Sequence, residues 1–209
     1  KVGFNQSYGY FTWRETKEEL QEYFEYLNQT DVKEYMICNI FPTTPDILPK
    51  HLQNAPAEMF KIRLALAATL SPVYGMCSGY ELCENIPGVK DELLNSEKYE
   101  FKVRDYSEPN SLAPFVTQLN NIRHENTSLQ KIGNVKFHHV NNDKLMCYTK
   151  ETEGNLLLIC VNLDPHHTQS ATVEFPFWEF NLPEHYKVHD LLSGAVYDWS
   201  GRDNFISLT

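Results

Sequence analysis

The carboxylate of Asp46 is the side chain whose surroundings most suggest chemistry. It follows an apolar run, residues 35–40, that predicts a strand, and it lies in the loop FPTTPDILP, which three prolines stiffen. In folds of alternating strands and helices, active sites gather where strands end, and a rigid loop holds a carboxylate in place. The same residue could instead form a turn or cap the helix that follows. Position alone leaves both interpretations open.

Two histidine pairs raise the question of a metal site. His138 and His139 lie in a predicted strand, where neighbouring side chains point to opposite faces and cannot easily hold one ion together. His166 and His167 follow VNLDP in a predicted turn, where a structural role is more typical. The chain also has no glycine-rich phosphate loop and no Ser–His–Asp spacing. We therefore predict no metal site and no cofactor.

The tryptophans and cysteines favour structural roles. Trp13, Trp178 and Trp199 could stack on sugar rings, but isolated tryptophans are more typical of a core or a domain interface. The five cysteines show no CxxC spacing. An odd number of cysteines without a signal segment predicts reduced, buried thiols and a cytoplasmic protein.

The net charge and the shortness of the apolar runs limit the partners that the protein could bind. The 209 residues carry 28 acidic and 18 basic side chains, a formal net charge of −10, which repels phosphate backbones and anionic lipid. No apolar run approaches the length of a membrane span. Nucleic acid and membrane are therefore excluded as predicted partners. The first residue is Lys1 rather than methionine, which suggests an excised or processed piece.

The first half of the chain alternates strands and helices. Residues 4–13 predict a strand and its loop, and residues 35–40 and 73–76 predict two more strands. Apolar spacing predicts helices at 17–28, at 58–70 and after Ser111, while residues 85–108 form a long polar loop of the kind that is usually functional. This alternation predicts parallel βα units.

The second half changes character near residue 131. Short strands are predicted at residues 135–140, 144–150, 156–162, 171–174, 186–190 and 205–208. Turn residues separate them, a pattern typical of an antiparallel sandwich. We therefore predict two domains, 1–130 and 131–209. Because three βα units cannot close a barrel of eight, the first domain is predicted to be the end of a (β/α)8 barrel.

Several long strings resemble one enzyme family. FNQSYGYFTWR, FPTTPDILP, RLALAATLSPVYGM, YELCEN, NSEKYE, VNLDPHHTQS and VHDLLSGAVYDW, spread over nearly the whole chain, are similar to the maltose 1-phosphate-dependent α-glucan maltosyltransferases of glycoside hydrolase family 13. The family implies a (β/α)8 barrel followed by an all-β domain. It also implies a retaining transfer that needs an Asp nucleophile, a Glu acid/base and a third carboxylate.

The resemblance assigns roles to three residues. Asp46 matches the third carboxylate, whose implied role is to bind sugar hydroxyls beside the reacting carbon. Lys98 and Tyr99, in NSEKYE, match the motif that holds the second glucose of the maltosyl group; without the resemblance they would be an ordinary exposed pair. The nucleophile and acid follow earlier strands that these residues do not include. Thr43 and Glu15 depart from the family, which commonly has Asn at both positions.

We accordingly expect the C-terminal part of an enzyme that moves a maltosyl unit from maltose 1-phosphate to an α-1,4-glucan, and we expect that part to be inactive alone. An amylase-type hydrolase, a trehalose-forming relative and a non-catalytic carbohydrate-binding module are the alternatives. Open barrel edges favour strand pairing between copies, so a homodimer is predicted.

Overall fold

Three short parallel strands begin the fold. The computed structural model describes residues 6–95 and 101–209. The strands are β1 (Ser7–Tyr8), β2 (Cys38–Ile40) and β3 (Val73–Tyr74), in the order β1-β2-β3. Within the described ranges, each outer strand pairs only with β2, so the sheet has two open edges.

One helix follows each of these strands along the chain. The helices are α1 (Lys17–Gln29), α2 (Ala57–Leu70) and α3 (Ala113–Glu125). Helix α1 begins where the Thr16 hydroxyl accepts the Glu19 N–H, while the Glu19 carboxylate accepts the Thr16 N–H, a reciprocal capping box. Helix α2 ends at Leu70, with Ser71 as its C-cap, just before Pro72, which cannot continue a helix. The predicted helices at 17–28 and 58–70 are confirmed to within a residue or so.

Three local predictions need correction. The cap of α3 is Leu112 rather than Ser111, although the Ser111 hydroxyl accepts a hydrogen bond of 3.2 Å from the Ala113 N–H. The strand predicted at 35–40 begins only at Cys38, because a 3₁₀ turn, Asp31–Glu34, holds the Met36 N–H on Val32 O. The strand predicted at 73–76 ends at Tyr74, and one further bond, from the Gly75 N–H to Ile40 O, extends the pairing.

Antiparallel strands make up the second half, as predicted. They are β4 (Val135–His138), β5 (Leu145–Thr152), β6 (Asn155–Asn162), β7 (Gln169–Glu174), β8 (His185–His189), β9 (Val196–Ser200) and β10 (Asp203–Leu208). The pairing order is β4-β5-β6, with β7 on β10 and β8 on β9. The sequence prediction missed β9: four of its five residues are exposed, so it carries little apolar signal.

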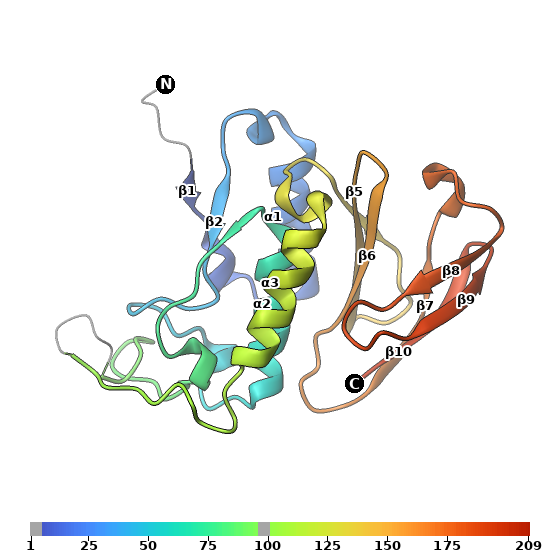
Figure 1. Cartoon of the computed structure of the whole chain (residues 1–209). Coiled ribbons are helices and arrows are strands. Elements are labelled where there is room, and N and C mark those ends of the chain that lie inside the picture. Colours follow the sequence, from blue (N-terminus) through green and yellow to red (C-terminus); the bar gives the residue numbers. More distant parts are fainter. Residues whose placement is uncertain (1–5, 96–100) are drawn as a thin grey trace.

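The helices lie between the parallel sheet and the β4–β6 sheet (Figure 1). One buried cluster draws on both halves of the chain, and its members include Phe11, Leu20, Phe24, Leu66, Met146, Tyr148 and Val161. The other face of β5 packs toward β7 through a second cluster that includes Leu145, Ala171 and Val173. Polar contacts also cross the boundary between the halves: the hydroxyls of Thr69 and Tyr148 are 2.5 Å apart. The two halves therefore share one core.

Candidate functional site

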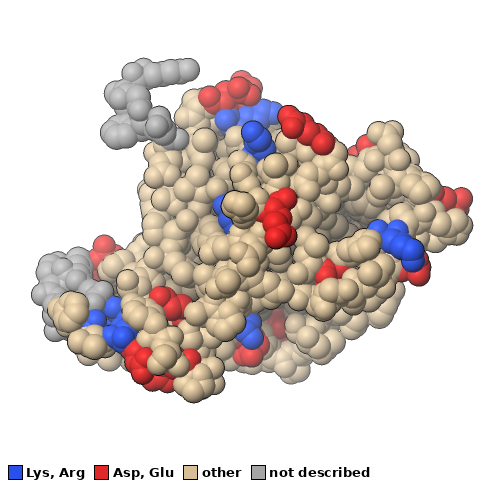
Figure 2. Space-filling model, viewed as in Figure 1, with Lys and Arg blue, Asp and Glu red and all other residues tan. Residues whose placement is uncertain are grey.

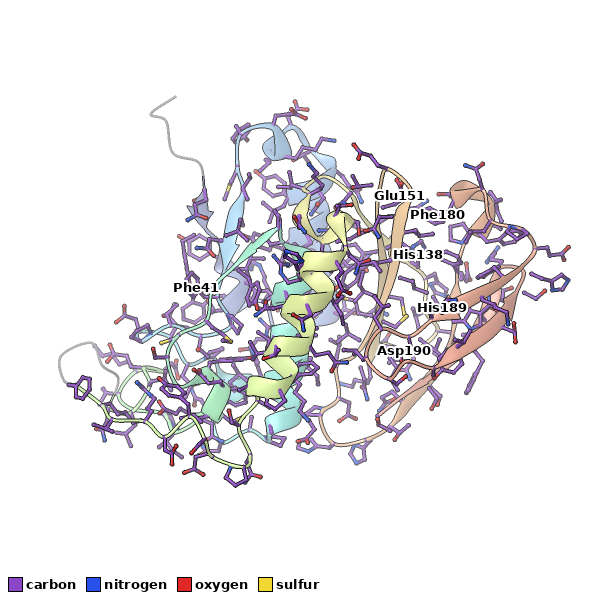
Figure 3. All side chains as sticks on the ribbon, viewed as in Figure 1. Phe41, His138, Glu151, Phe180, His189 and Asp190 are labelled. Atoms are coloured by element: carbon purple, nitrogen blue, oxygen red, sulfur yellow. The ribbon has the colours of Figure 1, made fainter. Side chains whose placement is uncertain are left out.

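The carboxyl ends of the three parallel strands meet at one edge of the sheet. The long loops that follow β2 and β3 gather at the lower left of the molecule (Figure 1). Phe41, the first residue after β2, marks this edge in Figure 3. In parallel βα folds this edge is where functional loops collect, and it is where Asp46 was expected.

One face of the parallel sheet is not covered by the helices. Register places Tyr8, Asn39 and Val73 side by side on this face, whereas Cys38 and Ile40 point the other way and are buried. The Tyr8 ring is 40% exposed, so this face is accessible. The Asn39 Oδ1 atom is buried, and among the described residues it accepts no hydrogen bond. A polar atom of this kind marks the face as something other than a plain apolar core.

Phe41 and Gly75 continue this face toward the loops. The centroids of the Tyr8 and Phe41 rings are 6.0 Å apart, so the two rings are neighbours. A Cβ atom built on Gly75 would lie 2.3 Å from the Phe41 ring, far closer than any real contact. Glycine is therefore required for the Phe41 ring to occupy its place. Sequence reasoning missed this aromatic pair, because its members come from different strands.

Asp46 lies in a tight turn on this edge. Thr44 and Ile47 exchange backbone hydrogen bonds of 3.0 and 3.1 Å, so that Pro45 and Asp46 are the central residues of the turn. Asp46 is exposed, and helix α2 begins well beyond it, at Ala57. The sequence left two structural roles open for Asp46, that of a turn residue and that of a helix cap. The turn is correct and the helix cap is wrong. A turn position is compatible with a functional carboxylate, because the turn holds the residue at the edge.

The loop that carries Asp46 is tied to the long loop predicted to be functional. The Leu48 N–H donates to Asp91 O at 2.6 Å. The Gln53 side-chain amide bridges Leu48 O and Asp91 Oδ1 at 3.0 and 2.8 Å. The Asn85 amide adds a bond of 2.8 Å to Ala55 O. The structure therefore brings residues 85–93 beside the Asp46 loop; Lys98 and Tyr99 lie outside the described residues.

A buried arginine supports the loop after β1. Arg63, on α2, is 2% exposed, and its guanidinium donates to Arg14 O at 2.9 Å and to Phe11 O at 2.8 Å. The same group lies 3.8 Å from the centroid of the Phe11 ring. Burial lowers the pKa of Arg63 to about 10, so the guanidinium remains charged at neutral pH. In the sequence, the arginine in the otherwise apolar string RLALAATL is the feature from which a buried, supporting arginine could have been predicted.

A second arginine secures the approach to β3. The guanidinium of Arg123, on α3, donates to the carbonyls of Ala68, Ser71 and Pro72 at the end of α2. It also lies 5.0 Å from the centroid of the Tyr74 ring. These bonds satisfy carbonyls that a helix end leaves without intrahelical partners. Arg63 and Arg123 thus fix the backbone on either side of the parallel sheet.

Glu15, one of the departures from the family pattern, lines a small cavity. The cavity has a volume of about 30 Å³ and is bordered by His51, Arg63 and Leu163 among others. Glu15 Oε1 is 3.6 Å from His51 Nδ1, too far for a hydrogen bond. Burial, helped by the charge of Arg63, lowers the pKa of His51 to about 3, so the imidazole is neutral at pH 7. The volume suits a single water molecule.

The side chains of His138 and His139 differ in exposure, as predicted for neighbours in a strand. His138 is buried, with Nε2 2.9 Å from the Thr149 hydroxyl, while the neighbouring His139 is exposed (Figure 3 labels His138). His167 contacts Asp164 within its own turn, at 3.1 Å. In residues 6–95 and 101–209, no group of three metal-ligating side chains occurs. Nor does any helix of that part have the length and apolarity to cross a membrane.

The prediction for the tryptophans is wrong for two of three. Trp13 and Trp178 are 50% and 54% exposed, and each lies in a short 3₁₀ turn. Trp199 packs edge-on against Tyr186 and Phe175, as a core residue does. On the face shown in Figure 2, acidic and basic side chains form small separate groups rather than one large basic patch.

Solved structures of similar shape show which known fold the chain shares. An α-amylase from Geobacillus thermoleovorans, solved with acarbose, superposes with a TM-score of 0.74 over 99% of this chain and 46% of that chain, at 14% identity. An Anoxybacillus α-amylase gives a TM-score of 0.71 over 99% of this chain and 45% of that chain, at 18% identity. At such identities the likeness concerns the fold alone. The chain therefore shares its fold with just under half of each of these two α-amylase chains.

Sequence comparison gives the particular family. Residues 137–209 match the model described as "GLGE, C-terminal". The α-1,4-glucan:maltose-1-phosphate maltosyltransferase 2 of Streptomyces coelicolor is 46% identical over 100% of this chain and 32% of its own length. The maltosyltransferase of Rhodospirillum rubrum is 46% identical over 96% of this chain and 30% of its own length. The chain belongs to the maltosyltransferase family and corresponds to a C-terminal portion, spanning about a third of these relatives.

Proposed function

We propose that the whole protein transfers a maltosyl unit from maltose 1-phosphate to an α-1,4-glucan. The observation that carries this proposal is the 46% identity with a maltosyltransferase across the entire chain. Sequence similarity this high, spread over both halves rather than confined to one motif, favours a shared reaction. The alternatives named from the sequence remain outcomes of the experiment below.

Within that protein, residues 1–130 supply the last three βα units of a (β/α)8 barrel and residues 131–209 supply the all-β domain. Two features support the barrel part of this proposal. The parallel order β1-β2-β3 leaves both outer strands open, as strands cut from a barrel would be. The helices cover only one face of the sheet, and the face bearing Tyr8 and Asn39 would point into the barrel.

Asp46 acts as the third carboxylate of the reaction. Its exposed position in a proline-bounded turn, at the carboxyl end of the sheet, supports this role. The reaction passes through an oxocarbenium-like state, in which hydrogen bonds from the sugar hydroxyls to a fixed carboxylate tighten. Arg63 and the hydrogen bonds that Leu48 and Gln53 donate to Asp91 hold the surrounding loops, so that the carboxylate does not need to be reoriented during the reaction.

Lys98 and Tyr99 bind the second glucose of the maltosyl group. An ammonium donates to hydroxyls, and a phenol offers both a polar tip and an apolar face, which suits a polyol. The support from the described residues is indirect: the segment 85–93, which leads toward them, is bound to the Asp46 loop. The open edges of the sheet further favour a homodimer when the 209 residues are present alone.

The experiment measures phosphate release from maltose 1-phosphate with a malto-oligosaccharide acceptor, using the full-length protein and residues 1–209 in parallel. We expect turnover by the full-length protein and none by residues 1–209, which lack the nucleophile and the acid. Parallel assays follow glucan hydrolysis and trehalose formation. Hydrolysis or trehalose formation without phosphate release would overturn the proposed reaction. Glucan binding without any turnover by the full-length protein would favour a carbohydrate-binding module.

A further inference from the structure

Cys147 and Cys160 lie directly opposite each other in the central sheet of the second half. The register of β5 and β6 pairs the two residues, and their Sγ atoms are 3.0 Å apart. Both residues are thiols in the structure. Opposed residues in an antiparallel pair have Cα atoms about 4.5 or 5.5 Å apart, and a disulfide spans about 4.4–6.8 Å. The backbone geometry thus already suits a disulfide.

The pair occupies a defined place between two layers. Cys147 is 1% exposed and belongs to the cluster with Leu145 and Val173, and Cys160 packs against that cluster. Cys38 provides a contrast within the same chain. Its sulfur lies 3.6 Å from the Tyr23 hydroxyl, in the other core cluster. The arrangement at β5 and β6 therefore differs from that of a cysteine that serves only as a small buried side chain.

We propose that Cys147 and Cys160 form a reversible disulfide by exchange with a low-molecular-weight disulfide. The Cys160 thiolate attacks one sulfur of the reagent, and one reagent thiolate leaves. The Cys147 thiolate then attacks Cys160 Sγ, and the second reagent thiolate leaves. Each leaving thiolate takes up one proton from those that the two cysteines release. In sum, two protein thiols are oxidised and one reagent disulfide is reduced to two thiols.

The surroundings set the conditions under which this exchange proceeds. Contact with Cys147 and burial both raise the pKa of the Cys160 thiol well above its ordinary value. Little thiolate is therefore present at neutral pH, and the reagent has little access to Cys147. Exchange in the native protein should be slow at neutral pH and faster at alkaline pH. It should be faster still when the β5–β6 hairpin opens transiently.

The disulfide would link β5 covalently to β6, two strands of the central sheet. Met146 and Tyr148, the neighbours of Cys147 on β5, pack against the helices of the first half. Cross-linking β5 to β6 restricts the unfolded chain and leaves the folded packing nearly unchanged. A short loop of this kind should raise the melting temperature of the oxidised form by roughly 5–10 °C.

The experiment uses the full chain with Cys38, Cys77 and Cys83 replaced by alanine, so that only this pair remains. It is incubated with oxidised and reduced glutathione at neutral and alkaline pH, and a second sample is refolded from urea in the same buffer. Thiols are then alkylated and the intact mass is measured. The control carries the further substitution Cys147→Ala. Should the triple replacement not fold, peptide mapping of the unaltered chain answers the same question.

We expect the mass of the chain to fall by about 2 Da, the two cysteines to resist alkylation and the melting temperature to rise. Reduction should recover both thiols in full. The control should carry one glutathione or one alkyl group and show no such stabilisation. The proposal is overturned if, after refolding in the oxidising buffer, both thiols are still alkylated. It is equally overturned if a glutathione adduct on Cys160 persists while Cys147 is present, or if mapping of the unaltered chain finds another pairing.

Discussion

Replacing Lys150 by methionine should stabilise the protein, although it removes a charged residue. Lys150, on β5, is fully buried, and its ammonium donates to Lys131 O at 3.0 Å. Within the described part of the chain it has no ion pair. Burial, with a smaller effect from the charge of Arg123, lowers its pKa from 10.5 to about 7. Folding therefore makes protonation of this amine unfavourable.

The size of the effect follows from the pKa values in the folded and unfolded chain. Between about pH 7 and 10.5 the unfolded chain binds more protons at Lys150 than the folded chain, so stability increases as the pH rises through this window. The penalty at pH 7 is at most about 4 kcal/mol. Methionine removes that penalty but leaves Lys131 O without its donor, which costs about 1–3 kcal/mol. The net expectation is a gain of about 1–3 kcal/mol at pH 7.

Urea unfolding of the parent chain and the Lys150→Met variant at several pH values between 7 and 10 tests this reasoning. The advantage of the variant should shrink by up to about 1.4 kcal/mol for each pH unit. Lys144→Met, which removes an exposed lysine beside the same strand, is the matched control and should change stability by less than about 0.5 kcal/mol. Parallel pH profiles for parent and variant would refute the burial argument, as would a Lys150→Met chain that is less stable at pH 7.

Two further predictions concern the residues that shape the edge of the parallel sheet. Gly75→Ala should destabilise the chain by about 1–3 kcal/mol, because the new methyl group meets the Phe41 ring. In urea unfolding, the additional change Phe41→Ala should relieve part of that loss, and purely additive effects would contradict the contact. Arg63→Met should cost about 1–3 kcal/mol, because it removes the side-chain donor to Arg14 O and leaves Phe11 O with only the Arg14 N–H. Arg63→Lys should recover little of this in the same measurement, because an ammonium cannot reproduce the two-pronged geometry; full recovery would show that charge alone matters.

Local pattern was sufficient to predict most elements of the fold. The apolar spacing of Leu20, Phe24 and Leu27 predicted α1, and all three are buried on one side of it. The short strands of the second half were predicted from their regular spacing and the turn residues between them. The exception, β9, has Trp199 as its main inward anchor, and one such residue does not produce an alternating pattern.

Contacts between distant segments were beyond such reasoning. Tyr8, Phe41 and Gly75 come together only because three strands align in register, and no single stretch of sequence records that alignment. The burial of Lys150 likewise depends on the docking of the helices onto β5, which places a charged side chain among apolar ones. Trp13 and Trp178 show the opposite error, since size and apolarity alone suggested burial.

The candidate site was predicted in outline. The proline-rich loop and the end of β2 located Asp46 at the edge of the sheet, where the structure places it, and the turn around it accounts for its fixed backbone. The hydrogen bonds that Leu48 and Gln53 donate to Asp91 were not foreseen, because they join residues far apart in the chain. The catalytic role of Asp46 and the sugar contacts of Lys98 and Tyr99 stay predictions.

The most direct test of the account is the rate of maltosyl transfer by the full-length protein carrying Asp46→Asn. This substitution keeps the size of the side chain and removes the charge that supports the oxocarbenium-like state. We predict a fall of roughly 10²-fold or more in phosphate release from maltose 1-phosphate, with folding unchanged by urea unfolding. Asp143→Asn, the same change in an exposed turn of the all-β half, should leave the rate unaltered. A well-folded Asp46→Asn enzyme with near-normal turnover would contradict the account and leave Asp46 as a turn residue only.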